Sequence, residues 1–527
     1  MLRHMKCFVW GFVLLTFFAA DLKAQFVYTN NDLAAGNSVS AFSLDLATGS
    51  LTELTSLGSP FATGGLGSGS SFYAPNRIIV VGDFLYASNS GSNSITAFTI
   101  DPSTGGLTLV GQPVATEGVN SATYAGISLA ATPDGKYIYA GTTGDGNITI
   151  YSIDSTTGAL TPLASGSPFA AGGAMSSMKV TPDGKYLAVA LYPLNEVAMF
   201  AIQTDGTLQK VSGSPFSSAS SAAGYLTGID VNCASTLLFA GRSGSDIDVF
   251  NINSGGTLSE LANSPFSTID PTTNTGPTSN QVVALSTDDS TLFSSNQGNN
   301  SVTAFAVGSD GSLSAPEATV GTGTGTLYPG GLAVSKDGGF LFAADTNAAV
   351  SAFALGGTSP LSFDSVASTG QTSGLHSLAA YPAKACASST STTSLNVTSL
   401  QIFGGPPPGF DLEATLSLDS SLVVDPLTQA VTIQVGSFTI NLPAGSFKTF
   451  QSGTNSGSDV FNGSIDGATL KIQITPLGQN QFQISDYAKQ IDLEGLANPV
   501  TVMVSIGGNA ASTSVDATDP AAIRWHR

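Results

Sequence analysis

Two observations predict an all-β protein. Of the 527 residues, 60 are glycine and only 10 % are charged, which is typical of short strands covered on both faces and joined by tight turns. A strand–turn–strand unit also recurs at intervals of 49 to 58 residues. Acidic residues outnumber basic ones by 36 to 16, and no basic cluster opposes that charge, so we expect no nucleic-acid partner.

The first 24 residues have the pattern of a secretory signal peptide. Arg3 and Lys6 precede an apolar run that ends at Ala20, and a small-residue cleavage site follows at Ala24. The run is too short to span a bilayer comfortably, and Cys7 stands at its start, whereas an acylated lipoprotein cysteine stands at its end. We therefore predict an exported chain, periplasmic or extracellular, without membrane insertion.

The repeated unit predicts a closed ring of blades. It begins at Val27, Leu85, Ile138, Leu187, Leu238, Leu292 and Leu341. A further apolar strand precedes each unit except the first, and the last such strand, at 376–384, has no unit after it. If that strand completes the blade begun by residues 26–30, residues 25–386 form a seven-bladed β-propeller of four-stranded blades, with no open sheet edge.

The turns and the cysteines predict no cofactor and no cross-link. Asp and Gly in the repeated PDG turns shape tight connections, and no Asp-rich loop has the spacing of a calcium site, so we expect no metal and no other cofactor. After signal cleavage only Cys233 and Cys386 remain. The repeat register assigns them to blades that are not neighbours, so the expectation is that they stay unpaired.

The period of about fifty residues ends after Cys386. The polar run ASSTSTTS at 387–394 is a predicted linker. Residues 395–520 then alternate apolar and polar residues in segments such as AVTIQVGSFTINL, which predicts a small antiparallel β-sandwich. No catalytic or metal-binding pattern stands out in this second domain.

Several phrases resemble one known family. TPDGKYIYA at 132–140, VYTN at 27–30 and IDSTTGAL at 153–160 are similar to repeats of the lactonase-type seven-bladed β-propellers, which include 6-phosphogluconolactonases and cycloisomerase-like proteins. The resemblance covers residues 25 to about 386. It implies a site at one end of the central channel, where Arg and His of a GPRHLAF-like phrase and Glu of an NEL-like phrase would bind a lactone and activate water.

This chain departs from the family pattern at those phrases. It has Ser176 and Ser177 in place of the Arg–His pair. Tyr192, in the next strand's phrase, stands where the family has Glu. Later blades show the same change: an SNRG-like phrase reads SNQG at 295–298, and a Pro–Arg phrase reads Pro–Gly at 329–330. Lactone hydrolysis needs a base and groups that stabilise the oxyanion, so the resemblance implies that the catalytic set is largely lost.

One end of the propeller is the predicted ligand face. In propeller geometry, the loops from second to third strands share a face with the connections between blades, and here these segments are polar and mildly acidic with one cation. A solvated rim is the simpler interpretation; the functional one is a shallow site for a small polar ligand, a carbohydrate or a peptide. The residues are Asp145, Tyr192, Glu196, Arg242, Asp246, Asn296, Gln297, Asp345 and His376.

Two functional hypotheses follow. The first is an exported, monomeric propeller that binds or scaffolds. The alternative is an active lactonase-like hydrolase of a carbohydrate lactone, with Arg242 and His376 as its polar groups. His376 stands at the channel end of the closing strand and is the one candidate base, but a hydrogen-bonded structural histidine is the favoured interpretation because no matched carboxylate partner is evident.

Overall fold

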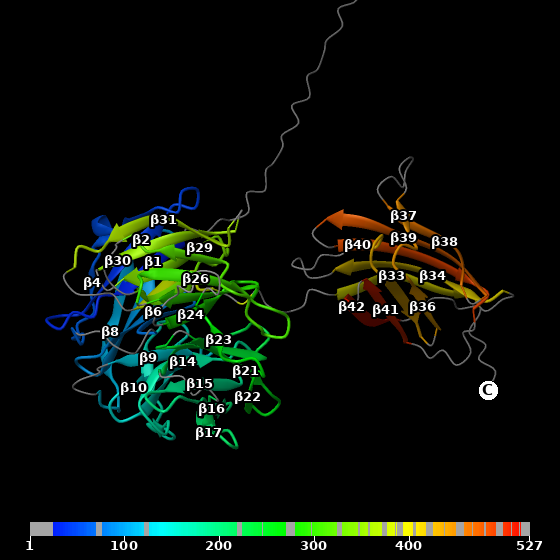
Figure 1. Cartoon of the computed structure of the whole chain (residues 1–527). Helices are drawn as coiled ribbons and strands as arrows, with labels where there is room; N and C mark the ends of the chain where they lie inside the picture. Colours follow the sequence, from blue (N-terminus) through cyan, green and yellow to red (C-terminus); the bar gives the residue numbers. More distant parts are fainter. Residues whose placement is uncertain are drawn as a thin grey trace, which may run out of the picture. The chain divides into compact units, whose positions relative to one another are not determined.

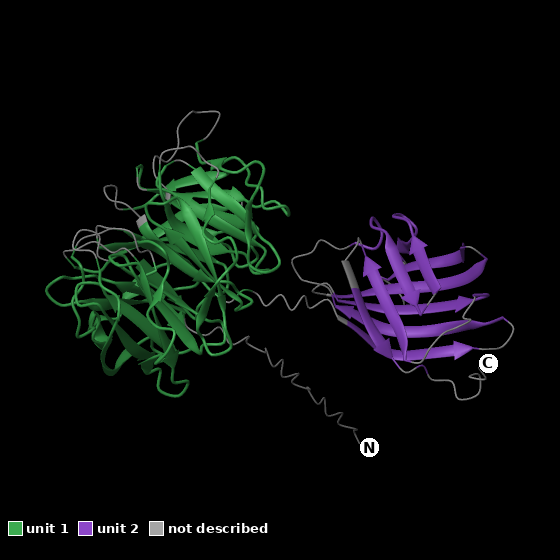
Figure 2. Ribbon diagram, turned by 90° about the horizontal axis from the view of Figure 1, so that it is seen from below, with its two compact units in different colours: residues 1–387 green, residues 388–527 purple. Residues whose placement is uncertain are grey.

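Segments that alternate β-branched or aromatic residues with small polar ones form the strands in the computed structural model. The chain divides into two compact units, residues 1–387 and 388–527 (Figure 2). The described residues are 25–69, 76–120, 126–218, 224–244, 246–269, 280–296, 298–323, 329–345, 348–356, 359–371, 377–384, 386, 394–403, 407–417, 425–436, 438–449, 458–465, 467–478, 481–491, 499–506, 509–515 and 517. Within them, no helix is long and apolar enough to cross a membrane.

The described residues of the first unit form seven antiparallel sheets, the blades of a propeller (Figure 1). The innermost strands, for blades 1 to 7 in order, are β32 (Ser377–Tyr381), β5 (Ile78–Val81), β9 (Ile127–Ala131), β14 (Met175–Val180), β19 (Leu226–Val231), β24 (Asn280–Leu285) and β28 (Pro329–Val334). The second strands are β1 (Gln25–Asn30), β6 (Phe84–Asn89), β10 (Tyr137–Thr142), β15 (Tyr186–Leu191), β20 (Leu237–Arg242), β25 (Thr291–Asn296) and β29 (Phe340–Asp345).

The outer half of each blade is more exposed. The third strands are β2 (Ser38–Leu44), β7 (Ser94–Ile100), β11 (Asn147–Ile153), β16 (Glu196–Ile202), β21 (Asp246–Ile252), β26 (Ser301–Ala306) and β30 (Ala349–Leu355). The outermost strands are β3 (Leu51–Glu53), β8 (Leu107–Ala115), β12 (Leu160–Pro162), β17 (Leu208–Lys210), β22 (Leu258–Glu260), β27 (Ala318–Gly321) and β31 (Leu361–Ser368), and a short 3-10 helix, η1 (Thr55–Leu57), follows β3.

The ring closes as the sequence predicts. β32 pairs antiparallel with β1, with Val27 opposite Ala380 and Thr29 opposite Leu378. Each innermost strand also contacts the next one around the ring, and β32 contacts both β28 and β5. The two ends of the propeller sequence therefore share blade 1, and the predicted closure is confirmed.

Glycine turns explain part of the repeat. In blades 2 to 5, the turn between third and outermost strands has a glycine at positive φ whose missing side chain makes room for an aromatic ring of the preceding blade. A Cβ on Gly105 would lie 2.4 Å from the Phe26 ring, and one on Gly158 would lie 2.4 Å from Phe84. The carbonyl of Gly105 also accepts a hydrogen bond of 2.9 Å from the Tyr28 hydroxyl. These contacts hold adjacent blades in register.

The repeated SPF phrases add a short extra strand to four blades. Each Phe opens a two-residue strand that pairs back onto the third strand of its own blade. The serine oxygen accepts a backbone hydrogen bond from that third strand, as Ser59 does from Ala41 at 3.0 Å and Ser214 does from Met199 at 2.9 Å. The extra strands are β4 (Phe61–Ala62), β13 (Phe169–Ala170), β18 (Phe216–Ser217) and β23 (Phe266–Ser267).

A disulfide joins Cys233 to Cys386, with Cα atoms 5.2 Å apart, so the expectation of two unpaired cysteines was wrong. Cys233 lies in the turn between β19 and β20 of blade 5. After β32 the chain leaves blade 1, and Lys384 donates a hydrogen bond of 2.6 Å to the carbonyl of Leu285 in blade 6. The repeat register failed here because Cys386 follows the last strand and belongs to no blade.

The second unit is a two-sheet sandwich around one apolar core. The six-stranded sheet has the order β33 (Ser394–Phe403), β34 (Gly409–Ser417), β40 (Gln481–Lys489), β39 (Ala468–Gly478), β38 (Asp459–Ile465) and β37 (Lys448–Thr449). The four-stranded sheet has the order β36 (Phe438–Leu442), β35 (Val431–Val435), β41 (Val500–Ile506) and β42 (Asn509–Val515). Inward residues of both sheets, such as Ile484 and Val504, fill the core.

One carboxylate interrupts that core. Asp486 lies on β40 opposite Leu412 and Ile472 and is fully buried. Among the described residues, neither of its carboxyl oxygens has a hydrogen-bond partner. Desolvation by burial raises the pKa of Asp486 to about 8, with a further contribution from the charge of Asp411.

Candidate functional site

The innermost strands begin at the end of the propeller where second-to-third-strand loops and blade-to-blade connections lie; we call it the loop face. Four of these strands, β14, β19, β24 and β28, show a register shift near their first residue. The bulged Ser176 donates a hydrogen bond of 2.8 Å to the carbonyl of Leu226 in the next blade. Ser177 accepts one of 3.4 Å from the Ile229 amide. Both serine hydroxyls therefore link blade 4 to blade 5.

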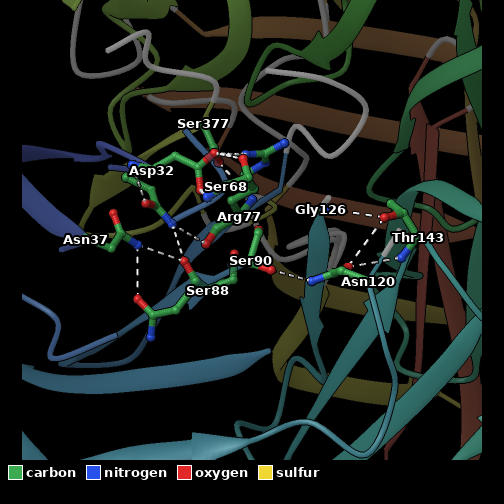
Figure 3. A network of polar contacts seen from close by, with 12 residues as sticks. Asp32, Asn37, Ser68, Arg77, Ser88, Ser90, Asn120, Gly126, Thr143 and Ser377 are labelled. Atoms are coloured by element: carbon green, nitrogen blue, oxygen red, sulfur yellow. Dashed lines mark hydrogen bonds and ion pairs between the residues drawn. The ribbon is translucent and has the colours of Figure 1, made fainter. Parts of the chain in front are cut away.

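A buried ion pair lies at the start of the innermost strand of blade 2 (Figure 3). Arg77 Nη1 lies 2.5 Å from Asp32 Oδ2, and neither side chain is more than 2 % exposed. Asp32 also accepts hydrogen bonds from the amide and the hydroxyl of Ser68. The Arg77 amide donates a bond of 2.9 Å to Ser377 Oγ, which begins the closing strand β32. The pair thus joins blades 1 and 2 at the channel.

Asn76 extends this polar cluster into the channel. Its side-chain amide donates a hydrogen bond of 2.8 Å to the carbonyl of Met178 on β14, in blade 4. Its own carbonyl accepts a bond of 2.7 Å from the Leu129 amide on β9, in blade 3. The sequence analysis did not single out Asn76 and Arg77, because it interpreted the segment RIIVVGD at 77–83 only as the apolar strand that precedes a repeated unit. The signal was available: an arginine stands at the first position of an otherwise apolar innermost strand.

A second bridge crosses from blade 2 to blade 3 at the same face (Figure 3). Asn120 donates a hydrogen bond of 2.8 Å to the carbonyl of Ser90. Its side-chain oxygen accepts a bond of 3.3 Å from the Thr143 amide, and the Thr143 hydroxyl accepts one of 3.1 Å from Gly126. The connection from blade 2 to blade 3 is therefore held by side-chain contacts as well as by strand pairing.

Arg242 occupies a structural position that recurs in other blades. In each case the last residue of the second strand reaches a polar side chain of the third strand. The pairs are Asn89 with Thr96 at 2.9 Å, Asn296 with Thr303 at 2.8 Å, Asp345 with Ser351 at 3.0 Å, and Arg242 with Asp248 at 2.6 Å. Both side chains of the last pair are 0 % exposed, so the guanidinium of Arg242 is turned inward.

Burial dominates the electrostatics of that pair. Desolvation raises the pKa of Asp248 to about 6, although the charge of Arg242 acts in the opposite direction. Asp248 Oδ1 and Arg242 Nε have no hydrogen-bond partner among the described residues. The guanidinium also donates a bond of 2.6 Å to Ser218 Oγ. Arg242 is thus held inside blade 5 by Asp248 and Ser218.

The model of the family "Lactonase, 7-bladed beta-propeller" matches residues 15–168, 127–220 and 241–361. This chain belongs to the lactonase family of seven-bladed β-propellers. No curated protein matches the chain. Among solved structures, a putative 6-phosphogluconolactonase from Bacteroides fragilis is 19 % identical, with a TM-score of 0.53 over 69 % of this chain and 99 % of that one.

The periplasmic gluconolactonase of Pseudomonas aeruginosa is also similar. It is 16 % identical, with a TM-score of 0.51 over 68 % of this chain and 98 % of that one. A protein from Lactobacillus plantarum, at 18 % identity, has a TM-score of 0.52 over 68 % of this chain and 99 % of its own. At these identities the likeness shows the fold, and the lactonase-family propeller accounts for the first unit.

The remaining predicted site residues of this lactonase-family propeller lie at different depths. Asp145 is exposed in the loop after β10, and Tyr192 and Glu196 are half-buried between β15 and the start of β16. Asp345 is fully buried at the end of β29. Gln297 and His376 lie outside the described residues. In the described part of the chain, no group of three or more His, Cys, Asp or Glu residues is arranged to hold a metal ion.

Proposed function

We propose that this lactonase-family propeller is an exported binding or scaffold protein that does not turn over lactones. The observation that carries the proposal is the burial of its two arginines in ion pairs. Arg77 and Arg242 are the only arginines among residues 25–386, and both are buried in ion pairs, with Asp32 and Asp248. To stabilise an oxyanion, either guanidinium would have to leave its carboxylate, and breaking a buried pair costs several kcal/mol.

The serines at the family's Arg–His position support the same proposal. Ser176 and Ser177 are fully buried, and their hydroxyls bond to the backbone of blade 5. Serines thus stand in place of the family's Arg and His, and each missing acid–base or oxyanion group commonly costs about 10² in rate. Background hydrolysis is the expected level of activity.

Export is part of this proposal. The disulfide between Cys233 and Cys386 supports it, because such bonds persist in oxidising compartments and are rare in the cytosol. A related fold is also periplasmic in Pseudomonas aeruginosa, as the name of that gluconolactonase states. The signal segment itself, residues 1–24, lies outside the described residues.

A ligand site at the loop face completes the proposal. Tyr192 and Tyr225 form an edge-to-face pair with ring centroids 4.7 Å apart, and Tyr225 is 38 % exposed. Asp145 lies in the loop after β10, and Glu196 is the first residue of β16. Exposed aromatic rings beside carboxylates suit a carbohydrate or a peptide, and a small polar ligand fits the same groups.

An active lactone hydrolase is the second candidate, favoured by one specific contact. Ser377, the residue that follows His376, accepts a hydrogen bond from the Arg77 amide. His376, the one histidine of residues 25–386, is therefore the sequence neighbour of a residue that is hydrogen-bonded to Arg77. In this candidate, His376 would be the base that activates water, and Arg77 would remain the counter-charge of Asp32.

One assay separates the two candidates. The purified protein is offered a panel of lactones that includes 6-phosphogluconolactone and gluconolactone, and acid release is followed in a pH-stat. We expect no saturable turnover above the uncatalysed rate. Saturable hydrolysis that is lost in His376→Ala, with Glu317→Gln on an outer edge as the unaffected control, would establish the hydrolase instead. Saturable hydrolysis that survives His376→Ala would overturn both candidates.

A further inference from the structure

Exposed apolar side chains gather on the loop face of blades 3 to 5. Val119 is 60 % exposed in the connection that enters blade 3, and Leu194 is 49 % exposed in the loop after β15. Tyr225 is 38 % exposed in the connection that enters blade 5. Single exposed apolar residues need no explanation, but three on consecutive blades of one face are a candidate contact surface.

Short contacts connect these residues into one surface. Val119 and Asp145 exchange two hydrogen bonds, from the Val119 amide to Asp145 Oδ2 at 2.9 Å and from the Asp145 amide to the Val119 carbonyl at 3.1 Å. A Cβ on Gly146 would lie 2.4 Å from the Gly173 carbonyl oxygen, and one on Gly173 would lie 3.1 Å from Leu194.

The Tyr192–Tyr225 pair then continues the surface from blade 4 to blade 5. Glu196 opens β16 two residues after Leu194, and it accepts a hydrogen bond of 3.1 Å from Ser217. We name this surface the blade 3–5 rim. It consists of Val119, Asp145, Tyr192, Leu194, Glu196 and Tyr225.

The rim is acidic, and no exposed cation shares its face. Residues 25–386 contain 24 acidic and only eight basic residues, and the structure describes all eight. Arg77 and Arg242 are buried in ion pairs. The six lysines lie elsewhere. Five are at the end of the propeller opposite the loop face: Lys136, Lys185 and Lys336 in turns, and Lys179 and Lys384 near Asp230. The sixth, Lys210, is on outermost strand β17.

Hydrogen bonds keep the carboxylate of Asp145 ionised at neutral pH. Desolvation acts to raise the pKa of Asp145, but hydrogen bonds from Thr142 and from the Val119 and Asn147 amides outweigh it, so this pKa lies below its ordinary value. None of the ion pairs among the described residues involves Asp145 or Glu196. The rim therefore carries negative charge beside exposed aromatic and aliphatic groups.

We propose that the blade 3–5 rim docks a cationic peptide segment that alternates Lys or Arg with aromatic or aliphatic residues. Glu196 and Asp145 pair with its cations, while Leu194 and Tyr225 cover its apolar side chains. A guanidinium over Tyr192 or Tyr225 adds a cation–π contact. A neutral carbohydrate would use the rings but leave the charge uncompensated, which is why charge complementarity selects the peptide. This inference rests on the proposed binding function.

The test uses the full chain and a labelled pool of peptides about twelve residues long, composed of Arg, Lys, Tyr and Leu, with fluorescence anisotropy as the readout. A matched pool has Glu in place of Arg and Lys. We expect saturable binding of the basic pool alone, weakened as salt is raised because surface ion pairs are screened. Glu196→Gln/Asp145→Asn should weaken binding about tenfold, the loss that two surface ion pairs give.

Matched variants keep the result specific. Glu317→Gln/Asp364→Asn removes the same charge from two exposed positions, one just before the outermost strand of blade 6 and one on the outermost strand of blade 7, and should leave binding unchanged. Equal loss in both double variants, or equal binding of the acidic pool, would refute the rim as the site. Circular dichroism confirms that each variant is folded. If neither pool binds and lactones are not turned over, this inference fails but the proposed function stands. Saturable lactone turnover would instead contradict the proposed function itself.

Discussion

The propeller and the sandwich treat buried charge in opposite ways. In the propeller, the carboxylates of Asp32 and Asp248 are paired with arginines, and the ends of second strands bond to third-strand side chains. In the sandwich, Asp486 is buried among apolar residues, and its carboxyl has no hydrogen-bond partner among the described residues. In the propeller a neighbouring strand supplies the partner, from the next blade for Asp32 and from the same blade for Asp248, whereas the apolar core of the sandwich supplies none among the described residues. Substitutions at these sites test that difference.

The largest expected effect lies in the sandwich. The folded state holds the pKa of Asp486 at about 8, against an ordinary value of 3.8. Because the folded pKa is raised, the stability of the sandwich is greatest below about pH 4 and falls as pH rises towards 8, by roughly 5 kcal/mol in all. Asp486→Val should remove this slope and raise the melting temperature of the sandwich at pH 8.

Calorimetry between pH 4 and pH 8 measures the effect on the second unit. Asp411→Asn, which removes the charge that adds to the raised pKa of Asp486, should reduce the slope without abolishing it. A sandwich transition of wild-type protein that does not move over this pH range would contradict the assignment of a buried, unpartnered carboxyl.

The next largest effect is expected from breaking the buried ion pair of Arg242 and Asp248 in the propeller. Arg242→Ala leaves Asp248 buried without its counter-charge and should lower the free energy of unfolding of the propeller by about 3 to 5 kcal/mol. The double variant Arg242→Met/Asp248→Leu, which removes both charges, should recover most of that loss. Denaturant unfolding measures both. A double variant no more stable than Arg242→Ala would show that packing, not charge pairing, sets the cost.

Removing the disulfide should have an intermediate effect. Cys233 and Cys386 are separated by 153 residues, and the bond ties the end of the closing segment to blade 5. Cys233→Ser/Cys386→Ser should lower propeller stability by about 2 to 4 kcal/mol. The sandwich contains no cysteine, so its transition is the internal control. An unchanged propeller transition would mean that pairing of β32 with β1 alone holds the ring closed.

The smallest effect belongs to a surface pair. Lys136 and Asp134 lie 2.9 Å apart in a turn, with side chains 69 % and 49 % exposed. Exposed ion pairs contribute little, because water and salt screen them. Lys136→Gln should leave the melting temperature of the propeller within measurement error. A clear loss would show that pairing matters in this protein even without burial.

Several features followed from the sequence alone. The period of the repeats, the alternation within each strand and the unmatched strand at 376–384 predict seven blades closed by the two ends of the propeller sequence, and β32 pairs with β1 accordingly. These are local patterns, since each strand and turn depends on residues that are close in sequence. The polar composition of the loop face was likewise predictable, because propeller topology assigns those loops to one end.

Only the tertiary structure decided what the charged groups do. Sequence reasoning assigned Arg242 to the loop face, but the structure turns its side chain inward to Asp248. Sequence reasoning predicted no partner for Arg77, which pairs with Asp32 at a sequence separation of 45 residues. It also left Cys233 and Cys386 unpaired, although a disulfide joins them at a sequence separation of 153 residues. Hydrophobic periodicity sets the path of the backbone, whereas the direction of the Arg242 side chain depends on packing inside blade 5. The pairing of Arg77 with Asp32 and of the two cysteines depends on how closing the ring brings distant segments together.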